Sequence, residues 1–367
     1  MADKPLILVN ALKLHEGPQR SPTGNFHHVL HLAGELAQSP EFDIRFLTDA
    51  DSHAPFAERV PARQLVRTPL QGNSILAADW AVFQAVRRLR PAIYHRPTGQ
   101  LPFFPLACRT IGGVADLNFR WLPGSRVKRL YKEASYRWTV QRADRVVCVS
   151  EFTRQDVARA LNCPAAKLRV IYHGANELPP PDTAILRRVP PRYWLTFAHQ
   201  KHKNAELCLQ ALAEHRRSHP ADALVLIGAH SHIQEVLQPL AARLGVADAA
   251  IFVGRVSAAE LAALYAQAAG LLFLSKFEGF GLPVLEAMHA GCPVISSNVC
   301  SLPEVAGQAA LMFAPDDLPG VVAAMLDLTV KPDFRRQLIA AGHAQARRFT
   351  WPQAARQTVA LYQELLC

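Results

Sequence analysis

Two carboxylates, Glu278 and Glu286, stand on either side of a short stretch that contains two glycines. The stretch follows an apolar run, residues 270–275, which predicts a buried strand. It leads into residues 283–290, which predict a short helix with proline in its first turn. Such a join directs backbone N–H groups and the positive end of a helix dipole at one point, where an anion can bind. Flanking carboxylates suit a ligand with hydroxyl pairs on either side of a diphosphate. The alternative interpretation is a plain strand, turn and helix with two solvated acids.

The sequence from Glu278 to Glu286, EGFGLPVLE, resembles the signature of the family-4 retaining glycosyltransferases, which have the GT-B fold. The resemblance implies two Rossmann-like, doubly wound parallel-sheet domains that face each other across a cleft. It also implies that Glu278 lies by the transferred hexose and that Glu286 holds the ribose hydroxyls. The implied diphosphate-binding residues are those of the loop, Gly279, Phe280, Gly281 and Leu282.

A second segment, residues 197–204, follows the first predicted strand of the C-terminal half and resembles the family's G-x-x-x-x-R-K-N. Lys203 and Asn204 match this pattern, whereas His202 replaces the arginine. The resemblance implies that Lys203 holds the donor's phosphates, with Lys201 or His202 as secondary candidates. A solvated basic helix start is the alternative, but cations are unfavourable at a helix N-terminus unless an anion is present. Further on, Arg255 either stacks on the nucleotide base or is simply exposed.

The N-terminal half offers fewer matches. In the family the first loop is glycine-rich and faces the diphosphate, but here, in residues 21–25, only Gly24 remains, and Asn25 is expected to cap the following helix. Three polar residues at predicted strand ends, His95, Asp116 and Asn118, are either ligand-binding residues or strand-end caps.

Residues 116–119 resemble the family's H-D-L segment, but Ala115 replaces the histidine that lies near the reacting sugar in relatives. That role is either missing or supplied by a neighbour such as His95. We therefore take Glu278, Asp116 and His95 as the candidate catalytic residues and leave the acid and the base unassigned.

No metal or other cofactor is expected. Residues 49–51 match a D-x-D metal motif, but they fall in the wrong half of the chain for a nucleotide site, and a solvated loop is the preferred interpretation. His27, His28 and His31 lack a completing carboxylate or cysteine, so solvated helix positions are favoured over a metal site. Helix N-termini and lysine can neutralise a diphosphate without metal.

The composition indicates a globular chain of two domains. With 367 residues the chain is long for a single core. Alternating strand and helix patterns predict one α/β domain over residues 1–180, which the C-terminal helix 351–367 joins because relatives show that crossing. A second, nucleotide-sugar-binding domain is predicted over residues 181–350, after a stiff proline-rich connection at 177–192. Seven scattered cysteines, no N-terminal signal pattern and no apolar run of about 20 residues favour a cytoplasmic protein.

The positive charge is concentrated in the first half. Residues 1–180 hold 24 Lys/Arg against 15 Asp/Glu, whereas residues 181–367 hold 16 against 15. Within residues 120–145, eight Lys/Arg oppose two acids and are interleaved with Trp, Tyr and Leu. This segment is interpreted either as a core helix with a solvated basic face or as a contact with anionic lipid at the inner face of the plasma membrane.

Together these patterns predict a retaining hexosyltransferase. Its donor would be a GDP- or UDP-linked sugar, and its acceptor a saccharide or lipid-linked glycan of cell-surface polysaccharide or lipopolysaccharide. Retention implies either front-face substitution or a covalent intermediate. The alternatives are another GT-B enzyme, such as a nucleotide-sugar epimerase or a phosphorylase, and a basic nucleic-acid-binding protein. The last is disfavoured because no recognisable nucleic-acid-binding module is present.

Overall fold

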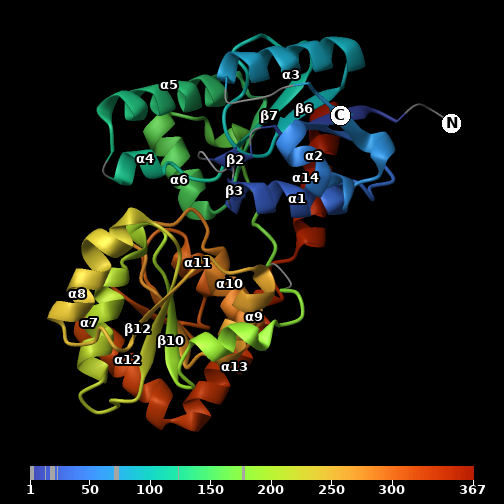
Figure 1. Cartoon of the computed structure of the whole chain (residues 1–367). Coiled ribbons are helices and arrows are strands. Elements are labelled where there is room, and N and C mark those ends of the chain that lie inside the picture. The colour runs from blue at the N-terminus through green and yellow to red at the C-terminus, as the bar shows by residue number, and fades with distance from the viewer. Residues whose placement is uncertain are drawn as a thin grey trace. The chain divides into compact units, whose positions relative to one another are not determined.

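The computed structural model describes residues 4–12, 14–16, 21–22, 24–69, 74–122, 124–175 and 178–367, without the side chains of residues 15, 16, 21 and 22. The chain divides into two compact units (Figure 1). Unit 1 comprises Met1–Gly174 and Thr350–Cys367, and unit 2 comprises Ala175–Phe349. The division thus falls six residues before the expected boundary at 180, and the C-terminal helix belongs to unit 1.

Unit 1 is built on a seven-stranded parallel sheet in the order β5-β4-β1-β6-β7-β8-β9. Its strands are β1 Leu6–Asn10, β4 Asp43–Thr48, β5 Leu65–Arg67, β6 Ile93–Arg96, β7 Arg109–Val114, β8 Arg145–Cys148 and β9 Leu168–Val170. A two-stranded antiparallel ribbon joins β2 His15–Glu16 to β3 Ser21–Pro22. Alternate residues of β1 enter opposite cores, Ile7 on one face and Leu8 on the other, as strand geometry requires.

Helices cover both faces of this sheet. They are α1 Gly24–Leu36, α2 Ala50–Ala57, α3 Ile75–Leu89, α4 Asn118–Trp121, α5 Arg126–Arg142, α6 Glu151–Leu161 and α14 Trp351–Leu366, with short 3-10 turns at Ala62–Gln64 and Ala165–Lys167. Residues of α1, α2 and α14 share one core, and residues of α3, α5 and α6 share the other. Each amphipathic helix therefore buries its apolar face against the strands.

Three sequence predictions in unit 1 are wrong. Asn25 does not cap α1, because the helix already includes Gly24. Asp49 does not lie in a solvated loop: it is buried and caps α2, and its side chain accepts a hydrogen bond of 2.9 Å from the backbone N–H of Ser52. His28 is not solvated but buried, stacked on Trp351 of α14. The last error arose because the partner helix lies far away in the sequence.

Unit 2 contains a six-stranded parallel sheet in the order β12-β11-β10-β13-β14-β15. Its strands are β10 Tyr193–Phe197, β11 Ala223–Ile227, β12 Ala250–Gly254, β13 Gly270–Phe273, β14 Val294–Ser297 and β15 Leu311–Phe313. Its helices are α7 Ala205–His215, η5 Ile233–Leu237, α8 Gln238–Arg243, α9 Ala258–Gln267, α10 Leu282–His289, α11 Leu302–Ala306, α12 Leu318–Val330 and α13 Pro332–Ala346. The capping box that Ser257 and Glu260 predict at the start of α9 is present.

The proline-rich connection is shorter than expected. Between its two proline clusters the chain forms a 3-10 helix, η3, at Thr183–Arg188, in which Ile185 is buried. The Arg188 guanidinium donates to the carbonyl of Val253, so this part packs on unit 2 rather than acting as a separate linker. Residues 176–177 lie outside the described residues.

Candidate functional site

The two predicted binding segments lie together at the centre of the unit 2 sheet. They follow β10 and β13, which are parallel neighbours. From this pair the strand order runs outward in opposite directions, through β11 and β12 on one side and β14 and β15 on the other. In open α/β sheets such a switch point leaves a crevice outside the carboxyl ends of the strands, which is where ligands bind.

The loop after β13 is held in place by a constrained glycine and by the side chain of Ser301. Gly281 caps α10 with φ +103°, and a Cβ at this position would lie 2.6 Å from a methyl carbon of Leu302. The Ser301 hydroxyl donates to the carbonyls of Glu278 and Phe280, at 3.1 and 2.9 Å. These constraints fix the loop that contains Gly279 directly before α10, which begins at Leu282.

Lys203 and Glu278 form an ion pair, with 2.6 Å between the lysine Nζ and the glutamate Oε1. Their side chains are only 8% and 11% exposed, and the ammonium lies 4.9 Å from the centre of the Phe273 ring. A charge this deeply placed is costly unless it is compensated, and each member of the pair compensates the other. The segment proposed to bind the phosphates and the segment proposed to bind the sugar therefore contact each other through the Lys203 ammonium and the Glu278 carboxylate.

Two further contacts fix the 3-10 turn Lys201–Lys203, η4, beside this pair. The backbone N–H of Lys276 donates to the carbonyl of His202 at 2.8 Å, which joins the turn to the loop after β13. Asn204 has φ +59°, a conformation that asparagine tolerates better than most residues, and its amide donates to the carbonyls of Leu274 and Pro315. Asn204 thus positions the start of α7.

Two histidines beside the pair are neutral at pH 7. Burial, together with the positive charge of Lys203, lowers the pKa of His199 and of His202 to about 4. Neutral rings can accept or donate a hydrogen bond without adding charge. Lys203 is thus the buried cation of this turn, and Lys201 is an exposed one.

The other predicted residues of unit 2 are placed as follows. Glu286 is half-buried on α10. The pKa of Tyr265 on α9 is raised mainly by burial and also by the negative charge of Glu286. Arg255 is exposed, directly after Gly254 at the end of β12.

The predicted residues of unit 1 have different surroundings. Gly24 is exposed at the first position of α1. Asp116 is half-buried, and its carboxylate accepts a hydrogen bond from the backbone N–H of Asn118, which starts α4. His95 is buried, with its Nδ1 2.7 Å from the Tyr362 hydroxyl, and burial lowers its pKa to about 3. These contacts favour a structural role for His95.

Sequence reasoning missed Ser301 and Phe273, which support the loop and the lysine. Ser301 precedes α11 after β14, so a third strand–loop–helix join was the available signal.

Within the described part of the chain, no group of three or more His, Cys, Asp or Glu could hold a metal ion. Among the same residues, no helix has the length and the apolar character needed to cross a membrane.

Two family models match the chain, one in each half. Residues 24–177 match Glycosyltransferase Family 4, and residues 197–345 match Glycosyl transferases group 1. The O-antigen chain mannosyltransferase B of Escherichia coli is 32% identical over 353 residues, which covers 92% of this chain and 90% of that protein.

Solved structures match nearly the whole chain. The sucrose-phosphate synthase of Thermosynechococcus elongatus superposes with a TM-score of 0.77 at 20% identity, over 99% of both chains. An Anabaena protein in complex with UDP-glucose superposes with a TM-score of 0.76 at 16% identity, over 98% of this chain and 100% of the other. These likenesses bear on the fold alone.

The matches establish the class of the protein, which is that of glycosyltransferase enzymes with the GT-B type of fold. The chain belongs to glycosyltransferase family 4. The fold class predicted from the sequence, two Rossmann-like parallel sheets, is confirmed for each unit.

Proposed function

We propose that this glycosyltransferase transfers a mannose-like or glucose-like hexose, with retention, from a GDP- or UDP-linked donor to a saccharide or lipid-linked glycan. The proposal places the reaction in cell-surface polysaccharide or lipopolysaccharide assembly. The name of the Escherichia coli relative supports a mannose donor and an O-antigen acceptor. The Anabaena structure, crystallised with UDP-glucose, supports a nucleoside-diphosphate sugar.

The observation that carries the proposal is the Lys203–Glu278 pair at the switch point of the unit 2 sheet. A cation and a carboxylate side by side match a donor that carries a diphosphate next to a hexose. The ammonium and the positive end of α10 would stabilise the departing diphosphate, while Glu278 would accept hydrogen bonds from the sugar. Glu286, eight residues further on, would hold the ribose hydroxyls.

The protein would contribute to the reaction by positioning the two substrates and by placing a fixed positive charge beside the diphosphate. Holding the anomeric carbon of the donor and the acceptor hydroxyl close together removes much of the entropic barrier, and the fixed cation acts where negative charge develops. Asp116, at the end of β7, is the unit 1 carboxylate proposed to lie by the acceptor. No metal is required in this scheme, so chelation with EDTA should leave turnover unchanged.

The test is nucleotide release with a panel of GDP- and UDP-linked mannose and glucose donors, with and without a saccharide acceptor. We expect one donor to dominate and the acceptor to raise its turnover. The anomeric configuration of the product, measured by NMR coupling constants, then tests retention. Inversion of the anomeric centre would refute that part, and no release with any donor and acceptor would refute the assignment of substrates.

We also propose that the start of α5 meets an anionic membrane surface. Val127, Leu130 and Tyr131 are 76%, 70% and 42% exposed, so the first half of this helix is not a core helix. Arg126, Lys128, Arg129 and Lys132 are exposed between them. Exposed cations interleaved with apolar side chains suit the headgroup layer of anionic lipid, where each cation contributes about 1 kcal/mol.

Vesicle sedimentation tests this surface. Vesicles with anionic lipid should bind the protein, neutral vesicles should bind it weakly, and high salt should release it because salt screens the attraction. Replacing Arg126, Lys128, Arg129 and Lys132 together with Ser should reduce binding and spare hydrolysis of soluble donor. Arg137 and Arg120 both pair with Glu133, so the variant Arg120→Ser with Arg137→Ser is a control that should bind nearly as the parent does. Undiminished sedimentation of the fourfold variant would exclude the membrane role.

A further inference from the structure

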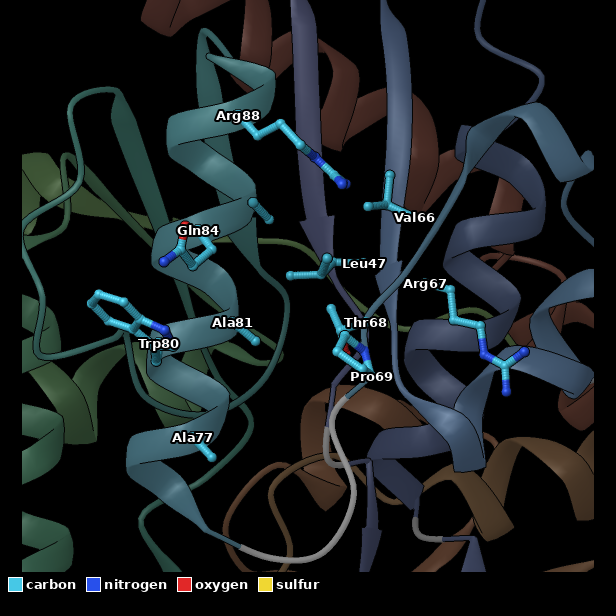
Figure 2. A pocket seen from close by; sticks show the side chains of 11 residues that line it. Leu47, Val66, Arg67, Thr68, Pro69, Ala77, Trp80, Ala81, Gln84 and Arg88 are labelled. Carbon is cyan, nitrogen blue, oxygen red and sulfur yellow. The ribbon is translucent and has the colours of Figure 1, made fainter.

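Unit 1 contains a groove of about 430 Å³ between helix α3 and strands β4 and β5 (Figure 2). Leu47 and Val66 line it from the strands. Ala77, Ala81 and Ala85 line it from the helix, four residues apart and therefore on one face. Their small side chains leave open the space between helix and sheet that larger residues would fill. The volume lies in the range of about 300–1,000 Å³ that small-molecule sites occupy.

One end of the groove carries a single positive charge. Figure 2 shows the Arg88 side chain reaching from the last turn of α3 toward the strands. Within the described parts of the chain, Arg88 makes no ion pair with a carboxylate. Gln84, one turn earlier on the same helix, also lines the groove and offers an amide donor. A lone guanidinium fork matches the two oxygens of a monocarboxylate and leaves the second charge of a phosphate unmatched.

Toward the opposite end the α3 side of the groove is apolar, whereas Arg67 and Thr68 line the strand side, and in Figure 2 the Arg67 side chain points away from α3. Pro69 and Ala77 lie there in Figure 2, at the beginning of α3. Ile75, Leu76 and Trp80, in the first two turns of this helix, are 42%, 67% and 49% exposed. Large exposed side chains gathered at one place usually mark a binding surface. A hydrocarbon chain that left the groove at this end would therefore meet more apolar surface before it reached water.

From this arrangement we propose that the groove binds a single-chain anionic amphiphile of the fatty-acid type, with its carboxylate at Arg88 and its chain along the alanines of α3. The charged end of the groove is separate from the residues proposed for the sugar chemistry. Because α3 connects parallel strands, it runs back against them, and Arg88 lies toward the edge of the sheet opposite the carboxyl ends where Asp116 lies. The apolar end follows the carboxyl end of β5, so it lies toward the same edge of the sheet as Asp116. The proposal concerns a ligand other than the donor and does not rest on the function proposed above.

Titration calorimetry of the full chain with decanoate, below its micellar concentration, tests this assignment. We expect saturable binding at one site. Decyltrimethylammonium has the same chain length but the opposite charge, and acetate has the head group alone; both should bind at least tenfold more weakly. Equal binding of the cationic probe would overturn the role of Arg88. Equal binding of acetate, or no saturable binding of decanoate, would overturn the groove as a chain site.

Variants separate the two ends of the ligand. Ala81→Leu and Ala77→Leu fill the groove and should each weaken decanoate binding at least tenfold; Ala77 is exposed, so its variant should fold even if the other does not. Arg88→Gln should weaken binding about two- to fivefold, as expected for an exposed ion pair. Arg87→Gln is the matched control, because that guanidinium lies over the Phe83 ring, and should bind as the parent does. Unchanged binding by the folded groove-filling variants would refute the site.

Discussion

Lys203 and Glu278 already have each other as partners, so a bound diphosphate must share or replace an existing contact. The lysine would then contribute mainly to ligands with a second phosphate. We predict that Lys203→Ala weakens the binding of the donor's nucleoside diphosphate more than that of the corresponding monophosphate. Calorimetry with both nucleotides measures the difference, and equal losses would show that Lys203 does not contact the second phosphate.

The same substitution leaves Glu278 buried without its cation, which should lower the free energy of unfolding by about 3 kcal/mol. The double variant Lys203→Ala with Glu278→Gln removes both charges and should recover part of that stability. If the double variant recovers stability but its affinity for the nucleoside diphosphate still exceeds that for the monophosphate by less than in the parent, the loss of binding comes from the missing lysine and not from a distorted fold.

Glu286→Ala should weaken nucleotide binding by about 1.5–3 kcal/mol, because two ribose hydroxyls would lose an ionised acceptor. The measurement is the affinity for the nucleoside diphosphate. Glu235→Ala, at an exposed position on η5, is a control for the loss of a negative charge in the same unit. An unchanged affinity of a folded Glu286→Ala protein would remove this residue from the site.

At the scale of elements, the loop between β13 and α10 depends on a glycine. An alanine at position 281 would combine two costs: the left-handed φ of +103°, about 1–2 kcal/mol, and a contact of 2.6 Å with Leu302, about 1–3 kcal/mol. We predict that Gly281→Ala lowers the free energy of unfolding by about 2–5 kcal/mol in a urea titration and weakens donor binding.

Gly245→Ala provides the matched control in the same unit. Gly245 also has a positive φ, +70°, but a Cβ there meets no atom within 4 Å. Its variant should lose only the conformational part, about 1–2 kcal/mol, and should bind donor normally. Equal destabilisation by the two substitutions would show that the contact with Leu302 relaxes at no cost.

Local signals explain which elements were predictable. The strand, the glycines and the helix around residues 270–290 are encoded within some twenty consecutive positions, and the structure places β13 and α10 there. Asn25 was wrongly predicted to cap α1, because asparagine commonly precedes a helix, whereas α1 already begins at Gly24. The edge strands β5 and β15, three residues each, lie in stretches with too short an apolar pattern to be recognised, whereas the equally short edge strand β9 lies within a longer predicted strand, residues 168–173.

At the scale of the whole molecule, the parts that could not be predicted are contacts between distant positions. Lys203 and Glu278 are 75 residues apart, and His95 and Tyr362 are 267 apart. The resemblance located both members of the first pair, because each belongs to a motif, but it gave no sign that they contact each other. The second pair lies outside any motif, so His95 was placed by its position at a strand end alone.

Histidines with lowered pKa values lie in both units and predict how stability depends on pH. Burial lowers the pKa of His28 and of His95 to about 3, and that of His199 and His202 to about 4, from 6.5. A histidine whose pKa falls on folding binds fewer protons in the folded chain than in the unfolded chain. The free energy of unfolding therefore falls as the pH drops below 6.5, by up to about 1.4 kcal/mol per pH unit for each such group.

His28 offers the sharpest test of this linkage. The centroid of its ring lies 3.9 Å from the centroid of the His173 ring. A protonated His31 would also repel a positive charge on His28, so these neighbours do not compensate the protonation of His28. We predict that His28→Gln makes the loss of stability between about pH 6.5 and about pH 5 smaller by up to about 1.4 kcal/mol per unit, as measured by urea unfolding. His27→Gln, one position earlier on the exposed face of α1, should leave the pH dependence as it is in the parent. If His28→Gln and the parent lose stability in parallel, His28 is not among the groups that make the protein sensitive to acid.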